Sequence, residues 1–225
     1  MGGTYVITGC NRGLGLEFVR QLVDRGEQVI ATARDLDQAT DLQALNVEAY
    51  SLDVADAESV GRFGEAMSGK SIDVLINNAG VGVSSKPFEA LDFGEMEEFF
   101  ATNTLGALRV FREVLPALRL GSGKKVINLT SKMGSIGDNS RGAAYSYRVS
   151  KAALNMATRS LAIDYRAEGF ICVVLHPGWV LTDMGGAGAP VTPEDSISGL
   201  LSVIDGLKPS DSGEHIDFTG VRVPW

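Results

Sequence analysis

Residues 4–15 read T-Y-V-I-T-G-C-N-R-G-L-G, a short β-branched run followed at once by a glycine-rich turn. The run predicts a strand over residues 5–8, and apolar residues at three- and four-residue spacing predict a helix over residues 15–25. Glycines let the backbone turn tightly and approach a pyrophosphate, while the start of a helix offers free N–H groups and the positive end of its dipole. This strand, turn and helix together predict a dinucleotide-binding fold.

The same alternation of strand and helix continues along the chain. Further strands are expected at residues 29–32, 47–52, 72–76, 125–129 and 171–175, and further helices at residues 36–45, 57–67, 95–118 and 145–167. Parallel strands need crossover connections, which are usually helices that cover both faces of the sheet. The pattern predicts an α/β fold, a single-domain doubly wound Rossmann-type parallel sheet with helices on both faces. Because no linker or repeat divides the chain, one domain is expected to span residues 1–225.

Composition narrows the possible partners. The chain has 225 residues, a net charge of −8 and a pI near 4.8, which argues against a nucleic-acid or anionic-membrane surface. No apolar stretch approaches the ~20 residues that cross a bilayer. Cys10 lies in the glycine turn and Cys172 in an apolar run, so both are expected to be reduced thiols. With no leader-like segment at the start, we expect a cytoplasmic protein.

The glycine spacing and six later motifs resemble the short-chain dehydrogenase/reductase family. Residues 8–15 read T-G-x-x-x-G-x-G, which differs from the G-x-G-x-x-G of ordinary Rossmann enzymes. In the family's order there follow Asp53-Val54, Asn77-Asn78-Ala79-Gly80, Asn103, Ser131, Tyr147-x-x-x-Lys151, and Pro177-Gly178 with Thr182. Residues 176–186 and the final Pro224-Trp225 look like the C-factor-like subfamily, kin to the carbonyl reductases.

The resemblance implies a set of nucleotide-binding residues along most of the chain. They are Gly9, Asn11, Arg12, Gly13, Leu14, Gly15, Arg34, Asp53, Val54, Asn78, Ala79, Gly80, Tyr147, Lys151, Pro177, Gly178, Val180 and Thr182.

The end of the second strand indicates which nicotinamide cofactor is bound. A carboxylate there would bind the ribose hydroxyl and repel a 2′-phosphate, but this chain has Ala33. Arg34 follows it and Arg12 lies in the glycine turn, so two guanidinium groups could clamp a phosphate. The prediction is NADP(H), with the alternative that Asp35 pairs with Arg34 instead.

Tyr147 and Lys151 are four residues apart on a predicted helix, which puts them on one face. An ammonium ~5 Å from the phenol would favour the phenolate by roughly 3 kcal/mol at an effective dielectric of ~20, which predicts a lowered pKa for Tyr147. The resemblance implies that Tyr147 gives its proton to a carbonyl oxygen while Lys151 also holds the nicotinamide ribose. It further implies that Ser131 hydrogen-bonds the substrate oxygen and that Asn103 holds a proton-relaying water. Ser135 is a rival for the role of the serine.

These features predict an NADPH-dependent oxidoreductase that reduces an aldehyde or ketone, or oxidises the alcohol, with Tyr147 as general acid. The alternative is a cofactor-binding regulatory or signalling protein on the same scaffold. Residues 185–190 are a candidate lid, and the candidate apolar wall consists of Val81, Met133, Trp179 and Met184.

Assembly and metal content can also be addressed from the sequence. Small residues on the expected helices 95–118 and 145–167 favour close helix packing, so a homodimer through these helices is expected, with a monomer as the alternative. His176 and His215 lack ligand-like neighbours, so no metal site is predicted.

Overall fold

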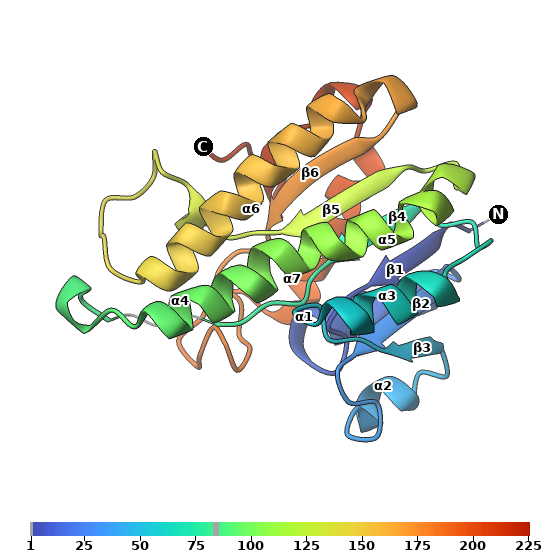
Figure 1. Ribbon diagram of the computed structural model, residues 1–225, viewed down its shortest axis with the longest axis horizontal. Helices are drawn as coiled ribbons and strands as arrows, with labels where there is room; N and C mark the ends of the chain where they lie inside the picture. Colours follow the sequence, from blue (N-terminus) through green and yellow to red (C-terminus); the bar gives the residue numbers. More distant parts are fainter. Residues whose placement is uncertain (1, 83–85) are drawn as a thin grey trace.

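The computed structural model describes residues 2–82 and 86–225, and across these residues all strands form one parallel sheet (Figure 1). The strand order is β3-β2-β1-β4-β5-β6-β7. Strands β1 to β3 are added toward one edge of the sheet and β4 to β7 toward the other, so the order of addition reverses between β1 and β4. The strands are β1 Thr4–Ile7, β2 Gln28–Ala33, β3 Glu48–Ser51, β4 Val74–Asn77, β5 Lys125–Leu129, β6 Ile171–His176 and β7 His215–Asp217. The predicted doubly wound α/β class is confirmed, and the reversal marks the point where such sheets bind ligands.

Helices cover both faces of this sheet because its strands are apolar on both sides. In β1, Tyr5 and Ile7 join one core cluster and Val6 joins the other. The first cluster packs under α1 Gly13–Asp24, α2 Thr40–Gln43 and α7 Pro193–Gly206. The second packs under α3 Ala57–Ala66, α5 Ala107–Leu120 and α6 Tyr145–Asp164 (Figure 1).

Shorter helical segments complete the described chain. They are α4 Phe93–Phe100, the π-helix η2 Ala101–Gly106, and the 3₁₀ turns η1 Phe88–Ala90, η3 Lys132–Gly134, η4 Arg166–Glu168 and η5 Pro209–Asp211. None of the helices in the described ranges is long and apolar enough to span a membrane.

Two predicted helices differ in the structure. The helix expected over residues 95–118 is α4, η2 and α5 in succession, with a π-turn where uninterrupted α-helix was expected. The helix expected over residues 36–45 shrinks to the four residues of α2. The Asp35 carboxylate explains the shortening, since it accepts hydrogen bonds from the backbone N–H groups of Asp37 and Gln38 and holds this segment in a turn.

Candidate active site

The carboxyl ends of β1, β4, β5 and β6 open onto one cavity of about 480 Å³. The cavity gathers residues that lie far apart in the chain, because parallel strands all end at the same edge. The predicted cofactor residues that line it are Gly9, Asn11, Arg12, Gly13, Leu14, Gly15, Arg34, Asp53, Val54, Asn78, Ala79, Gly80, Tyr147, Lys151, Pro177 and Thr182.

The turn between β1 and α1 requires glycine at two positions. Gly9 has φ +73°, and a Cβ there would lie 2.9 Å from the Cα of Ala79. A Cβ on Gly15 would lie 2.1 Å from the carbonyl oxygen of Gly9. Without these side chains, the turn passes close to the segment after β4 and leaves its backbone facing the cavity.

Thr8 and Asn78 hold this turn to the end of β4. The Thr8 hydroxyl accepts hydrogen bonds from the backbone N–H groups of Asn78 and Ala79, both at 3.0 Å. In return, the Asn78 amide donates to the carbonyls of Thr8 and Gly9 at 2.8 and 3.0 Å. The two loops therefore form one rigid rim of the cavity.

Two predicted cofactor residues do not line the cavity. Gly178 has φ +89°, and a Cβ there would lie 2.9 Å from the Phe218 ring, so it packs against the sheet edge. Val180 is buried and pairs with Val191 in an isolated bridge. Both residues therefore support the segment after β6 from the side that faces away from the cavity.

The cavity also contains residues that the sequence did not point to. They include Glu98 and Thr102, which lie four apart on the continuous α4 and η2 segment, and Asp183 in the loop after β6. Glu98 and Asp183 resemble ordinary surface carboxylates in the sequence. The position of Thr102 beside the predicted Asn103 was the only local signal.

The two predicted phosphate-binding arginines both border the cavity, but their surroundings differ. Arg34 is exposed, and the neighbouring Asp35 uses its carboxylate on the turn at residues 37–38. Arg12 is exposed too, and its guanidinium donates to Asp183 at 2.9 Å. This ion pair links the glycine turn to the loop after β6.

Tyr147 and Lys151 lie together on the buried face of α6. The Lys151 Nζ is 5.8 Å from the centroid of the Tyr147 ring and donates to the Leu129 carbonyl at 2.8 Å. The Ser131 side chain hydrogen-bonds the Tyr147 hydroxyl, and the Ser131 Oγ also accepts from the Met133 N–H. The rival Ser135 is buried, and its hydroxyl accepts from the Asp138 N–H. The geometry therefore places Ser131 against the phenol.

Burial is the largest influence on the pKa values of Tyr147 and Lys151. It raises the pKa of Tyr147, although the hydrogen bond from Ser131 acts in the opposite direction. It also lowers the pKa of Lys151 to about 8. The lowered pKa expected for Tyr147 is wrong for this structure, because the loss of solvation of the phenolate outweighs the other influences on it.

Asn103 is buried in η2, next to the lysine. Its Oδ1 accepts from the Val81 N–H at 2.8 Å and its Nδ2 donates to the Ser150 hydroxyl at 3.0 Å. A Cβ on Gly80 would lie 3.0 Å from the Asn103 Oδ1 and 3.7 Å from the Lys151 Nζ, so both groups face the same bare backbone. A π-turn is the kind of irregularity that often marks a functional segment of a helix.

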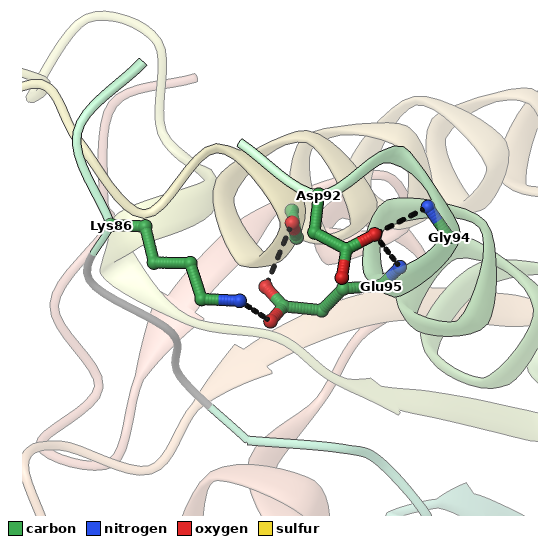
Figure 2. A network of polar contacts seen from close by, with 5 residues as sticks. Lys86, Asp92, Gly94 and Glu95 are labelled. Carbon is green, nitrogen blue, oxygen red and sulfur yellow. Dashed lines mark hydrogen bonds and ion pairs between the residues drawn. The ribbon is translucent and has the colours of Figure 1, made fainter. Parts of the chain in front are cut away.

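A carboxylate from α4 holds the start of α6, and Figure 2 shows this carboxylate, Glu95, beside Lys86 and Asp92. Glu95 accepts from the Ser146 hydroxyl at 3.2 Å and pairs with Lys86 at 2.8 Å. Asp92 accepts from the N–H groups of Gly94 and Glu95 and so caps α4. Because α6 has no side-chain cap of its own, the Glu95 charge near its first turn is favourable for the helix dipole.

The candidate apolar wall is only partly present. Val81 and Met184 line the cavity, and Met184 lies close to Gly82. Trp179 is 59% exposed and donates from its ring nitrogen to the Gly185 carbonyl, while Met133 is half-buried beside Ser131. The candidate lid at residues 185–190 lies within a loop closed by a 2.8 Å hydrogen bond from the Leu181 N–H to the Val191 carbonyl.

No cluster of three metal-ligating side chains occurs in residues 2–82 or 86–225. The groups that the site brings together are a buried phenol, an ammonium and a hydroxyl. These groups adjoin a glycine-rich turn at the start of a helix.

Comparisons with known proteins agree with this geometry. The family model described as short chain dehydrogenase matches residues 4–190. The chain is 52% identical to the C-signal protein of Myxococcus xanthus over 154 residues, which cover 68% of this chain and 93% of that protein. The carbonyl reductase Sniffer of D. melanogaster superposes with a TM-score of 0.95 at 32% identity, covering all of both chains.

A second solved structure is similarly close over its full length. The NADPH-bound carbonyl reductase from chicken fatty liver gives a TM-score of 0.92 at 36% identity, covering 100% of this chain and 99% of that one. With the family model matching well over half of the chain, the protein belongs to the short-chain dehydrogenase family of oxidoreductases.

Proposed function

We propose that the protein reduces an aldehyde or ketone to an alcohol with NADPH, using Tyr147 as the general acid. The observation that carries this proposal is the buried Tyr147 hydroxyl. It is hydrogen-bonded to Ser131 and lies beside Lys151, in the same cavity as the glycine-rich turn.

The cavity offers a dinucleotide a turn of bare backbone and two guanidinium groups. Gly9 and Gly15 leave bare backbone at the N-terminus of α1, which suits a pyrophosphate. Arg12 and Arg34 border the cavity and suit the extra phosphate of NADPH, while Asp53 also lines the cavity and suits contact with the adenine. The NADPH-bound chicken carbonyl reductase supports this choice. When bound, NADPH supplies the hydride.

The side chains of this protein would handle the proton. Because burial raises the pKa of Tyr147, the phenol stays protonated at neutral pH and can donate to the carbonyl oxygen. Ser131 donates a hydrogen bond to the same oxygen and stabilises the negative charge that develops there. Lys151 holds the nicotinamide ribose. The proton relay from Asn103 to Lys151 remains a prediction.

The substrate is expected to have an apolar body. Val81 and Met184 line the same cavity as the reacting groups and provide apolar surface there, and the short segment over residues 183–193 leaves little chain to enclose a substrate. Loose selection among such substrates is the corresponding expectation.

Replacement of Tyr147 by Phe tests the chemical role. We expect kcat for NADPH oxidation against a panel of aldehydes and ketones to fall by about 10²- to 10⁴-fold, because only the phenolic hydroxyl is lost. Tyr145→Phe is the matched control. Tyr145 lies on the same helix, one residue before Ser146, and its ring packs against Phe88. Its turnover should stay near that of the wild type. Unchanged turnover in Tyr147→Phe would refute the proposed acid.

Titration with each cofactor tests the choice of nicotinamide. NADPH should bind more tightly than NADH, and the Arg34→Ala variant should lose most of that difference. Equal or tighter NADH binding by the wild type would overturn the assignment.

A signalling role is the second candidate, and it is supported by the 52% identity to the protein named C-signal. A sensor needs the glycine turn but has no need of the tyrosine. Tight NADPH binding with no turnover on any carbonyl in wild type and Tyr147→Phe alike would favour this role.

A further inference from the structure

Ser150 joins the two parts of the site that carry the reacting groups. It lies in the turn of α6 between Tyr147 and Lys151, and its side chain is almost completely buried. Its hydroxyl donates to the Tyr147 carbonyl at 2.8 Å and accepts from the Asn103 amide at 3.0 Å. One hydroxyl thus bonds to both the helix and the π-turn.

Thr104 adds a second connection between the same two segments. Its hydroxyl donates to the Ser150 carbonyl at 2.8 Å, and Thr104 is 3% exposed. Asn103 and Thr104 are neighbours in the wide turn of η2, and both of their side chains bond to Ser150. The π-turn is therefore attached to α6 at the residue that separates the phenol from the ammonium.

We infer that Ser150 is a positioning residue for the reaction, an inference that rests on the proposed function. Tyr147 and Lys151 share one helical turn, so a small rotation of that turn moves both groups relative to Ser131 and Leu129, which are fixed to β5. The hydrogen bonds of Ser150 with Asn103 and Thr104 oppose such a rotation. A displacement near 1 Å at a reacting group can cost about 10²-fold in rate, so this restraint bears directly on turnover.

Two substitutions remove the connection without adding bulk. Ser150→Ala deletes the hydroxyl between Asn103 and Tyr147, and Thr104→Val deletes the donor to the Ser150 carbonyl. Each is expected to lower kcat by about 10- to 100-fold. The KM for NADPH should change by less than about threefold, because the glycine turn and the arginines remain in place.

Thr158 offers a matched control on the same helix. Its buried hydroxyl donates to the Leu154 carbonyl at 2.8 Å and accepts from the Asn128 amide at 2.7 Å, the same pattern that Ser150 makes, two turns further on. Thr158→Val should lower Tm by about as much as Ser150→Ala, because each removes one hydrogen-bond acceptor from a buried amide. It should keep kcat within about threefold of the wild type, because the catalytic turn keeps its attachment to η2.

The conservative variant distinguishes positioning from packing. Ser150→Thr keeps the hydroxyl and adds one methyl group, and Ser150 borders an apolar groove of about 270 Å³ between α4 and α6. We expect Ser150→Thr to recover kcat to within about threefold of the wild type. A kcat in Ser150→Ala no lower than that in Thr158→Val, or a Ser150→Thr variant as impaired as Ser150→Ala, would overturn the inference.

Hydrogen exchange provides a readout that needs no substrate. In Ser150→Ala the backbone amides of residues 147–151 should exchange faster than in the wild type, whereas in Thr158→Val their rate should not change. If the wild type turns over no carbonyl, the proposed function fails but this measurement still decides whether Ser150 holds the turn. Identical exchange in Ser150→Ala and the wild type would show that it does not.

Discussion

Burial determines the protonation states of Tyr147 and Lys151. The phenol stays neutral because its pKa is raised, while the ammonium loses its proton more readily because its pKa falls to about 8. The pair is thus set to give a proton from the phenol at neutral pH, which suits carbonyl reduction. The attraction between the two groups, which the sequence suggested as the main effect, is secondary to solvation here.

The lysine should give the reaction its upper pH limit. Lys151 is charged below its pKa, so the charge is present at pH 7 and is lost as the pH rises through about 8. We expect kcat/KM for NADPH to be level near pH 7 and to fall above about pH 8, since this parameter reports the groups of the free enzyme. Steady-state rates from pH 6 to 10 provide the measurement. Lys151→Arg keeps its charge throughout this range and should lose the inflection, whereas a wild-type profile that is level to pH 10 would contradict the assignment.

The turn before α1 depends on the absence of side chains. In Gly15→Ala the added methyl would lie 2.1 Å from the Gly9 carbonyl oxygen and 2.5 Å from the Asn78 amide nitrogen. The turn must therefore move, and we expect NADPH affinity to fall by more than about tenfold and stability by about 1–3 kcal/mol. Fluorescence titration and urea unfolding measure the two effects.

Gly61→Ala in α3 is the control for this substitution. A Cβ at Gly61 meets nothing within 4 Å. Because alanine favours helix, this variant should be more stable by about 0.5–1 kcal/mol and should bind NADPH as the wild type does. Equal binding by Gly15→Ala and Gly61→Ala would exclude the turn as the pyrophosphate site.

Asp183, in the loop after β6, competes with a bound phosphate for Arg12. Arg12 donates to Asp183, so a bound 2′-phosphate must share or replace that carboxylate. An exposed pair contributes about 0.2–1 kcal/mol, so Asp183→Asn should tighten NADPH binding by about 1.4- to 5-fold and leave NADH binding unchanged. Asp205→Asn removes a comparable pair with Arg25 outside the cavity and should change neither affinity. Weaker NADPH binding in Asp183→Asn would show that the carboxylate assists the cofactor instead.

The elements that sequence patterns missed have local explanations. The strand β7 is only three residues long and contains His215 and Asp217, so it lacks the apolar run that marks the other strands. The helix α7 does carry signals, with Thr192 as N-cap, Pro193 in the first turn and Asp195 accepting from the Thr192 hydroxyl. These signals predict a helix start, but they lie directly after the glycine-rich loop that we interpreted as a lid.

The candidate site was predictable where chemistry follows sequence spacing. Tyr147 and Lys151 share a helical turn, and the glycines share one loop, so short-range patterns identify them. Glu98 and Asp183 enter the cavity through long-range contacts, which no spacing in the chain encodes. The hydrogen bond between Ser150 and Asn103 also depends on the π-turn, which periodicity alone does not reveal.

Other expectations about the protein as a unit remain predictions. The extent of one domain over residues 1–225, a homodimer through α5 and α6, and a cytoplasmic location belong to this group. Exposed apolar side chains on α6, among them Met156 and Ile163, are consistent with a partner on that face.

The stability of the protein should depend on pH through two histidines, the half-buried His176 and the buried His215. Burial lowers the pKa of His176 and of His215 to about 4, well below the value near 6.5 expected in the unfolded chain. The unfolded state therefore binds more protons between these values, so stability is present above pH 6.5 and is lost as the pH falls toward 4. At pH 5 the loss should be roughly 2 kcal/mol per histidine.

Replacement of His215 by Phe tests this dependence. The phenyl ring can keep the contact with the Trp225 ring, which lies 5.7 Å away between centroids. Urea unfolding at pH 7 and pH 5 should show a loss of stability about 2 kcal/mol smaller in His215→Phe than in the wild type. The same pH dependence in both proteins would exclude His215 as a source of acid sensitivity.

The order of the strands also affects when parts of the chain can fold during synthesis. At the centre of the sheet β1 pairs with β4, and Thr8 bonds to Asn78, 70 residues later. The first helix, α1, shares a core cluster with the last one, α7. Contacts this distant in sequence slow folding, because the loop between them must close before they form. On the ribosome, the glycine turn emerges first, gains its β4 partner only after about 70 more residues, and gains its α7 support only once Pro193–Gly206 have been made, so the nascent protein should acquire its complete nucleotide cradle late.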